Sequence, residues 1–422
     1  MIPVKTKVHV YTQSENRQSL VPHFQPTTKI ILLASLVAFF LSGCIKEFPG
    51  DHETNLYLVS STKIGDFTKA QLDARYTDKT GTGFLAQLDK YDISVYKIEY
   101  KTKYINDSTI IASGAVIIPK DALLPSMMSI EHGDILNNEI FAPSHYTPGP
   151  INVASTYNEG SAAASNGYIT VLPDYIGYGS SKNLMHPPSH RSSLATSCAD
   201  MIRAAQEFLR QTQQPWSHKL YIAGYSEGGF ANLSLQQYIE EQHLPFNLKA
   251  SSTGAAPSHI SKIAQYVFNY PSDPGSAKNF LAVILFYNSY YPNLQRPISA
   301  YLKEPYASDV AKNGLGNATV DASLNTILTS EFVNGINNGT DEAFIQALKD
   351  NDVYDWKPLH PLLLQHSKDD EVIPYFNSED AYQAMIARGA AHVQLVTLTG
   401  SHDEAIEPYV VGTLQFFKAH IW

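Results

Sequence analysis

The chain alternates short apolar runs with longer stretches of helical periodicity. Residues 94–101 alternate between apolar and polar positions, and residues 109–118 are apolar on both faces. The turn residues Asn106 and Asp107 between them complete the pattern of a β-hairpin. Apolar runs predict further strands at 126–130, 168–173, 219–223, 248–252, 361–364 and 392–398. Helical periodicity predicts helices at 67–75, 83–88, 193–210, 378–387 and 404–419.

This order of elements predicts an α/β fold. Strands that alternate with helices form a mostly parallel sheet covered by helices on both faces, and the hairpin predicts antiparallel strands at its leading edge. The alternation stops at 257–355, where helical patterns rich in aromatic residues replace it. Because a structureless loop of that length is improbable inside a domain, we expect an inserted helical cap there. The core then comprises residues 64–256 and 356–422.

The aromatic residues of the predicted cap have two interpretations. Half or more must form the core of the cap, and some line an apolar acyl pocket, although the sequence does not say which. They are Tyr266, Phe268, Tyr270, Phe280, Phe286, Tyr287, Tyr290 and Tyr291.

The N-terminal segment is distinct from the fold. Lys29 precedes a largely apolar run from Ile30 to Leu41, too short to span a bilayer but typical of a signal-peptide core. The ending Leu41-Ser42-Gly43-Cys44 resembles a bacterial lipobox, in which the cysteine thiol receives a diacylglyceryl group. We therefore expect a lipoprotein signal peptide at 1–43, lipidation of Cys44 and a tether at 44–63. A plain secretory signal with a chance cysteine, or a buried apolar helix, is the alternative.

Composition and charge narrow the class of protein. A chain of 422 residues that is 44% hydrophobic and 17% charged can bury a large core. The formal net charge of -10 becomes -13 without residues 1–43, which carry four basic residues and one acid, so nucleic acid is an unlikely partner. Lipidation of Cys44 would leave Cys198 as a small core residue of a helix and no pair for an intrachain disulfide. We expect the protein to lie in the bacterial cell envelope, where the lipid on Cys44 would attach it to a membrane.

A candidate nucleophile lies in Gly224-Tyr225-Ser226-Glu227-Gly228, where the strand at 219–223 meets a helical pattern. A serine at a sharp strand-to-helix turn exposes its hydroxyl above the sheet, and glycines on either side let backbone pack closely. The alternative is an ordinary glycine-rich turn. The flanking strand and helix favour the nucleophile.

A serine needs a general base and an acid that orients it, each placed just after a later strand. His402 follows the last predicted strand and fits the base. The competing histidines, which lie at other places in the chain, are His132, His186, His190, His360, His366 and His392. For the acid, spacing alone does not choose among Asp369, Asp370 and Glu371.

Oxyanion donors are expected at two places. The backbone N–H of Glu227 follows the nucleophile at a helix N-terminus, and Gly133 or Asp134 in the loop after the strand at 126–130 supplies the second. The His132-Gly133 pair can also be a simple strand-ending turn. Asp174 precedes the serine, against the expected order of acid and base, so we interpret it as a residue that braces its loop.

Several motifs resemble the secretory lipase family of α/β-hydrolases. The segment from His366 to Tyr375, HSKDDEVIPY, is similar to the family loop whose aspartate completes a catalytic triad, and the matching position is Asp370. Similar motifs occur in family order at 141–146, 173–179, 224–229 and 400–402. The resemblance implies an α/β-hydrolase fold with a helical cap and an ester hydrolase acting on lipid or other acyl esters. It also favours Asp134 over Gly133 as the second oxyanion donor.

The sequence therefore predicts a lipid-anchored serine hydrolase with Ser226, Asp370 and His402 as its triad. The expected reaction cleaves carboxylic esters, of lipids or short acyl chains, through an acyl-enzyme without metal or cofactor. One alternative is a serine exopeptidase of the same fold, which would need a cap carboxylate such as Glu304, Asp309 or Glu331 near the site. The other is a non-catalytic surface lipoprotein that binds acyl ligands.

Overall fold

The structure is a computed structural model that describes residues 55–76, 83–135, 141–147, 156–271 and 274–421. The signal peptide, Cys44 and most of the predicted tether lie outside the described residues. No helix within the described ranges is long and apolar enough to cross a membrane.

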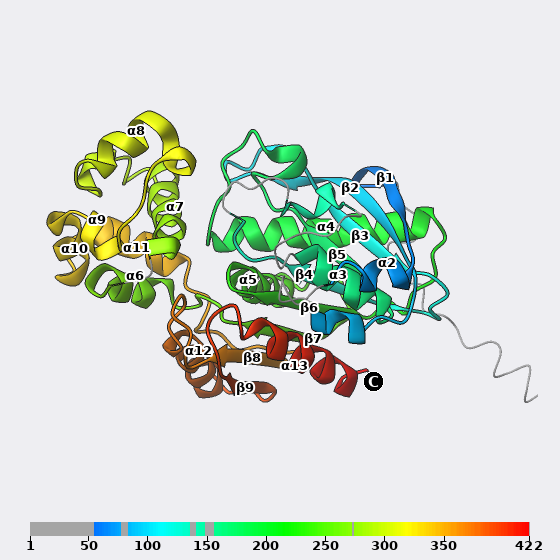
Figure 1. Cartoon of the computed structure of the whole chain (residues 1–422). Coiled ribbons are helices and arrows are strands. Elements are labelled where there is room, and N and C mark those ends of the chain that lie inside the picture. The colour runs from blue at the N-terminus through cyan, green and yellow to red at the C-terminus, as the bar shows by residue number, and fades with distance from the viewer. Residues whose placement is uncertain (1–54, 77–82, 136–140, 148–155, 272–273, 422) are drawn as a thin grey trace, which may run out of the picture. The chain divides into compact units, whose positions relative to one another are not determined.

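A nine-stranded sheet, with the strand order β1-β2-β3-β5-β4-β6-β7-β8-β9, organises the described chain (Figure 1). Strands β1, β2, β3 and β5 pair antiparallel, and every pair from β5 to β9 is parallel. The predicted mostly parallel sheet with an antiparallel leading edge is therefore confirmed. The strands are β1 (Leu58–Phe67), β2 (Ile93–Lys103), β3 (Thr109–Pro119), β4 (Ser126–Glu131), β5 (Tyr168–Pro173), β6 (Leu220–Tyr225), β7 (Leu248–Gly254), β8 (Leu362–Ser367) and β9 (Val393–Leu398).

Helices cover both faces of the sheet because successive side chains of a strand point to opposite sides. On β3, Val116 packs into one apolar cluster while Ala115 and Ile117 pack into another. The first cluster includes α4 (Arg191–Gln211), α5 (Glu227–Glu241) and α12 (Phe376–Ala387). The second includes α3 (Thr156–Ser165) and α13 (Ile406–Ala419). Short 3-10 helices lie at η4 (Pro143–His145), η5 (Gly179–Ser181) and η6 (Ile298–Ala300).

The insertion at 257–355 is helical, as the sequence predicts, and forms the group of helices at the left of Figure 1. Its side chains continue the apolar cluster on the α4 and α5 side of the sheet. The two segments that join it to the core are held together where Val353 N donates to Ser258 O at 2.9 Å. Its helices are α6 (Ile260–Asn269), α7 (Pro274–Tyr290), α8 (Tyr306–Asn317), α9 (Leu324–Ile327), α10 (Ser330–Asn337) and α11 (Glu342–Asp350).

The start of the core was predicted wrongly. Residues 58–63, assigned to the tether, belong to the edge strand β1, which extends to Phe67. Edge strands face water along much of their length, so β1 is mostly polar and lacks the apolar alternation that marks a strand. The helix predicted at 67–75 is confined to α2 (Lys69–Asp73), and that at 83–88 is the 3-10 helix η2 (Gly83–Gln87).

The chain before β1 is fixed by one side chain of α4. The Glu207 carboxylate accepts hydrogen bonds from the backbone N–H groups of Leu56 at 2.8 Å, Tyr57 at 3.0 Å and Leu58 at 2.7 Å. Backbone donors at the start of an edge strand have no ladder partner of their own. Glu207 supplies that partner and joins β1 to α4.

Glu207→Ala is expected to lower the free energy of unfolding by about 1–2 kcal/mol, because three backbone donors lose a charged acceptor. Urea denaturation of the full chain measures the change. The matched control is Glu241→Ala, whose carboxylate is about half exposed in its ion pair with Arg191. The control should change stability by less than about 1 kcal/mol, and an equal loss in both variants would contradict the role of Glu207.

Candidate active site

The turn between β6 and α5 holds Ser226 in an unusual backbone conformation. Its φ of 59° and ψ of -124° lie outside the regions that non-glycine residues normally adopt. Ser226 N donates to Gly254 O of β7 at 2.9 Å, which fixes the turn to the sheet. This backbone raises the serine hydroxyl above the carboxyl ends of the parallel strands, where ligands bind in open α/β sheets.

Two glycines of the motif are required by close backbone packing. A Cβ at Gly224 would lie 2.1 Å from Gly228 O, and a Cβ at Gly228 would lie 2.0 Å from Glu131 O of β4. Neither position can accept a side chain without moving backbone. The sequence pattern around Ser226 is therefore a packing requirement of the turn.

His402 connects Ser226 to Asp370. Its Nε2 lies 3.1 Å from Ser226 Oγ, and its Nδ1 lies 2.7 Å from Asp370 Oδ2. Since a carboxylate only accepts hydrogen bonds, Nδ1 carries the proton and Nε2 keeps a lone pair directed at the serine hydroxyl. The structure thus brings together the three residues that the sequence predicts as a triad, and their catalytic roles stay a prediction.

The Asp370 side chain is fully buried and well supplied with donors. Its Oδ1 accepts from Val372 N at 2.9 Å and Ile373 N at 2.7 Å, and His366 Nε2 lies 3.3 Å from Oδ2. Burial alone favours the neutral acid, but the contacts with His366 and His402 and the backbone donors hold the pKa of Asp370 well below its usual range. Asp370 is therefore ionised and keeps the His402 ring oriented.

The two carboxylates beside Asp370 hold the backbone of the histidine loop. Glu371 Oε2 accepts from His402 N at 3.0 Å, and Asp369 Oδ2 accepts from Gly400 N at 3.3 Å. Neither contacts the His402 ring in the described hydrogen bonds. Geometry thus distinguishes the three neighbouring acids that spacing alone does not separate.

The competing histidines have other contacts. His366 is buried against Ser378 and Ile373, His190 contacts Ser193, and His360 contacts Glu240. His132 stacks on Tyr175 with ring centroids 4.0 Å apart. His186 contacts Glu227.

The predicted oxyanion residues lie beside Ser226. Glu227 is the first residue of α5, so its N–H is at the helix N-terminus. A Cβ at Gly133 would lie 3.7 Å from Ser226 Cβ, and Asp134 lines the same pocket as Ser226 and Glu227. Which of Gly133 and Asp134 donates stays a prediction.

Asp174 braces its loop, as the sequence interpretation expects. Its carboxylate is buried and accepts from Ser113 Oγ at 2.6 Å and Ser144 N at 2.7 Å. These bonds hold the loop after β5 against β3 and η4. Asp174 has no part in the contacts of His402.

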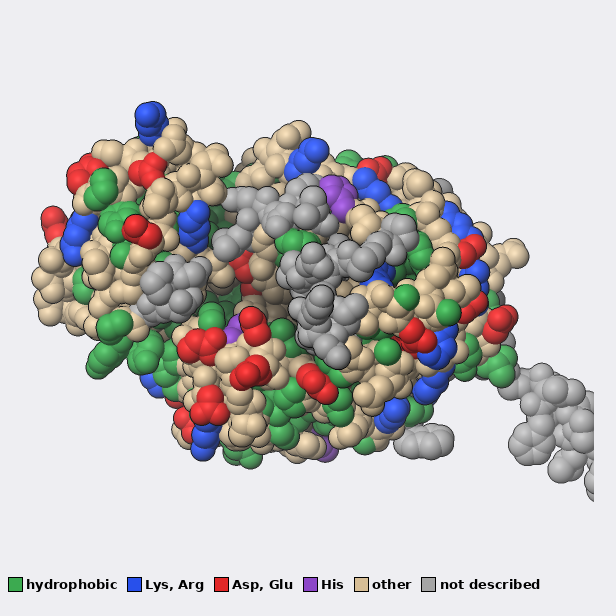
Figure 2. All heavy atoms as spheres, in the orientation of Figure 1, with side chains coloured by type: hydrophobic (Ala, Val, Ile, Leu, Met, Phe, Trp, Pro, Cys, Tyr) green, Lys and Arg blue, Asp and Glu red, His purple; other side chains and the backbone are tan. Residues whose placement is uncertain are grey.

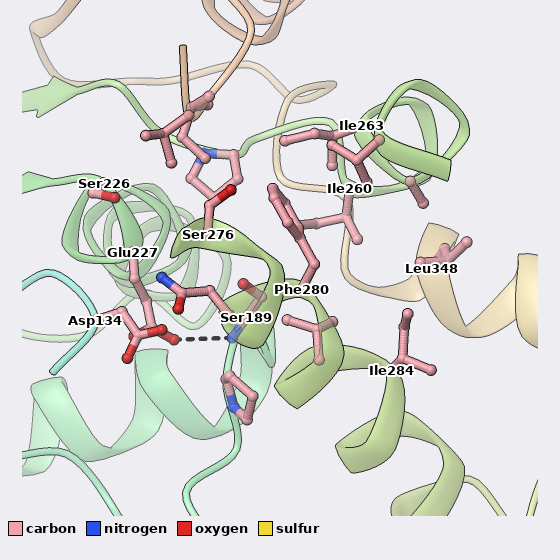
Figure 3. Close-up of a pocket in the computed structure, with 18 of the residues that line it drawn as sticks. Asp134, Ser189, Ser226, Glu227, Ile260, Ile263, Ser276, Phe280, Ile284 and Leu348 are labelled. Carbon is pink, nitrogen blue, oxygen red and sulfur yellow. Dashed lines mark hydrogen bonds between the residues drawn. The ribbon is translucent and has the colours of Figure 1, made fainter. Parts of the chain in front are cut away.

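A pocket extends from Ser226 into the cap (Figure 3). It holds about 730 Å³ of space between atoms, its open mouth included. Asp134, Ser226 and Glu227 lie at one end in Figure 3, and apolar side chains of α6 and α7 at the other. The surface is hollowed between the cap and the core, with acidic side chains visible inside (Figure 2).

The aromatic residues of the cap divide only partly as the sequence suggests. Phe268 and Phe280 line the pocket, while Phe286 and Tyr287 are buried in the apolar core. Tyr266 and Tyr270 are instead exposed, at 43% and 58%. Their positions depend on the helix packing of the cap, which periodicity does not specify.

Sequence reasoning missed two residues that support the triad. Tyr225 donates its hydroxyl to His402 O at 2.7 Å, and His366 contacts Asp370 from the end of β8. Tyr225 lies within the motif around Ser226, and His366 lies four residues before Asp370. The sequence therefore contains both residues, but their contacts follow from the fold. Within the described ranges, no group of three or more His, Cys, Asp or Glu side chains could hold a metal ion.

The sheet order, the turn at Ser226 and the cap together define an α/β-hydrolase. A solved structure of a candidate hydrolase from Legionella pneumophila is similar, with a TM-score of 0.77 and 27% identity over 86% of this chain and 98% of that one. The rice cell wall degrading esterase LipA from Xanthomonas oryzae has the same fold, with a TM-score of 0.72 and 21% identity over 87% of this chain and 100% of that one. Candida antarctica lipase A in its closed state shares it with a TM-score of 0.62 and 17% identity, over 87% of this chain and 82% of that one.

The model of the family described as secretory lipase matches residues 160–407, which include Ser226, Asp370 and His402. This chain belongs to the secretory lipase family. Lipase 10 of Candida albicans is 27% identical over 239 residues, 53% of this chain. The chain spans about half the length of that curated relative, 49%.

Asp370→Asn is expected to slow labelling of Ser226 by a fluorophosphonate about a thousandfold, because an amide in place of the carboxylate favours the wrong histidine tautomer. Labelling rates of the purified full chain measure the change. Asp369→Asn is the matched control and should alter the rate less than about threefold, since the Asp369 carboxylate accepts from the Gly400 backbone and does not touch the His402 ring in the described hydrogen bonds. Equal losses in both variants would contradict the assignment of the acid.

Proposed function

We propose that this chain is a carboxylic ester hydrolase that works through an acyl-enzyme on Ser226. The observation that carries the proposal is the continuous contact from Ser226 Oγ through His402 to a buried, ionised Asp370 at the end of an apolar pocket. Membership of the secretory lipase family and the fold shared with named esterases and lipases support the same reaction class.

The residues have distinct roles in the proposed reaction. His402 Nε2 takes the Ser226 proton while Oγ attacks the ester carbonyl carbon, and Asp370 stabilises the imidazolium that forms. The negative oxygen of the tetrahedral intermediate is held by the Glu227 N–H and a donor from Gly133 or Asp134. His402 then protonates the leaving alcohol. Water, activated by His402, hydrolyses the acyl-enzyme and releases the acid.

The pocket lining favours an apolar acyl group. Ile260, Ile263, Phe280 and Ile284 face the space on the cap side (Figure 3), and burying an acyl chain there removes apolar surface from water. Lipid esters and short acyl esters share this chemistry. Chain length is therefore the property that the substrate experiment has to measure.

The two alternatives have less support. The exopeptidase requires a cap carboxylate near the nucleophile, but Glu304, Asp309 and Glu331 do not line the pocket beside Ser226. Asp309 instead accepts a hydrogen bond from Thr319 N at 2.7 Å on the cap itself. A non-catalytic acyl-binding protein would not need the ordered contacts of Ser226, His402 and Asp370.

We also propose that the mature chain is a lipid-anchored protein of a bacterial cell envelope. The support is the lipobox-like Leu41-Ser42-Gly43-Cys44 after an apolar run, followed by residues with scattered charge. Lipidation would start the mature chain at Cys44. An anchored hydrolase would meet its substrate from a membrane surface.

Purified full chain is expected to hydrolyse nitrophenyl acyl esters and not dipeptidyl nitroanilides. Ser226→Ala should lower kcat by about a millionfold, because the acyl-enzyme cannot form. Rates across acyl chains of increasing length identify the preferred ester. Activity of the Ser226→Ala variant equal to wild type, or faster turnover of the amides, would contradict the proposal.

Expression in a bacterial host with labelled palmitate tests the anchor. The wild-type chain should carry the label and sediment with membranes, whereas Cys44→Ser should lose both the label and membrane association, since the acceptor thiol is gone. Cys198→Ser is the matched control, because Cys198 is buried in α4, and it should remain labelled. Unlabelled wild-type protein would refute lipidation at Cys44.

A further inference from the structure

Glu227 places a buried carboxylate beside the active site. The residue directly follows the nucleophile, its side chain is 8% exposed, and it lines the pocket with Ser226 and Asp134 (Figure 3). An uncompensated carboxylate here would oppose the negative charge that develops on the substrate oxygen, because charges interact strongly where water is excluded. The proposed ester hydrolysis, on which this inference rests, therefore needs a counter-charge close to Glu227.

His186 is positioned to supply that charge. Its Nε2 lies 3.3 Å from Glu227 Oε1, and its Nδ1 lies 2.8 Å from Ile176 O. A carboxylate and a carbonyl can only accept hydrogen bonds, so the ring satisfies both when both nitrogens carry protons. Ser189 N adds a further donor to Glu227 Oε1 at 3.2 Å (Figure 3).

His132 also lies near this pair but is not its cation. Its ring nitrogens contact the carbonyl oxygens of Gly133 at 2.7 Å and Asp174 at 3.1 Å, and no carboxylate is among these partners. Burial lowers the pKa of His132 and so disfavours a charge on its ring. Burial likewise opposes charge on His186, but the Glu227 carboxylate, helped by Ile176 O and Asp134, outweighs it and raises the pKa of His186.

The other groups around His186 leave its charge in place. The Asp134 carboxylate, in the loop after β4, acts in the same direction as Glu227 and favours the imidazolium. Tyr178 and Tyr175, in the loop after β5, lie with ring centroids 4.9 Å and 6.1 Å from that of His186. Burial raises the pKa of Tyr175 well above its usual range, so its hydroxyl stays neutral.

We propose that His186 is a positioning residue of the active site, whose imidazolium holds and neutralises the Glu227 carboxylate so that the oxyanion can form at the neighbouring N–H. His186 loses its proton as the pH rises, and an uncompensated carboxylate then remains beside the oxyanion. Hydrolysis should consequently fall at alkaline pH.

The test compares pH profiles of the full chain on a neutral, soluble ester, with initial rates measured by pH-stat. His186→Gln should lower kcat about tenfold or more, the effect of one unbalanced charge in a dry site, with little change in KM. Glu227→Gln should lack the alkaline fall. In the double variant His186→Gln/Glu227→Gln, kcat should recover relative to His186→Gln, because the charge that needed compensation is absent.

A merely structural pair would behave differently. The double variant would then be no better than His186→Gln, and the alkaline fall would be the same in wild type and Glu227→Gln; either result overturns the proposal. If His186→Gln does not fold, histidine-labelled NMR of wild type and Glu227→Gln replaces it. The His186 ring should keep its second proton to higher pH in wild type, and equal titration midpoints would refute the pair. This titration does not require turnover, so a wild-type chain that hydrolyses no ester contradicts the proposed function independently.

Discussion

The backbone conformation of Ser226 is the constraint on which the rest of the site depends. A positive φ at a non-glycine residue costs about 1–3 kcal/mol and persists only where surrounding structure enforces it. Here the enforcing contacts come from three parallel strands: β6 carries the turn, β7 accepts the Ser226 N–H, and the end of β4 packs against Gly228. The sheet thus stabilises the one conformation in which the serine hydroxyl faces the histidine loop after β9.

Two carboxylate–histidine pairs flank this turn and differ in their chemistry. Asp370 holds the Nδ1 proton of His402 and leaves Nε2 free for the serine, so this pair can move a proton. His186 instead has acceptors at both nitrogens and cannot act as a base while they are engaged. The difference arises from the partner of the ring nitrogen that does not face the carboxylate. In His402 this partner is the Ser226 hydroxyl, and in His186 it is the backbone carbonyl of Ile176.

The cap supplies mostly apolar walls, together with Ser276 and Asn279 of α7, to a site whose predicted catalytic groups come from the core. Asp134, Ser226 and Glu227 stand at the carboxyl ends of β4 and β6, while Ile263 and Phe280 come from α6 and α7. Polar groups on a rigid sheet keep their mutual geometry, and apolar residues on separate helices can vary in packing without disturbing it.

The α/β order of elements, the helical insertion and the candidate residues Ser226 and His402 could be predicted from the sequence, because buried strands and strand-end loops leave strong local patterns. The sequence did not determine β1, since an exposed edge strand at 58–67 has no apolar alternation and is defined by pairing with β2. It also left three adjacent acids unresolved, and a resemblance was needed to favour Asp370. In the tertiary structure, Asp370 contacts the His402 ring, whereas Asp369 and Glu371 accept hydrogen bonds from backbone N–H groups. The fold also brings His186 into contact with Glu227, which lies 41 positions away in the sequence. Such contacts depend on where loops from different strands meet above the sheet. The spacing of residues along the chain does not specify these meeting points.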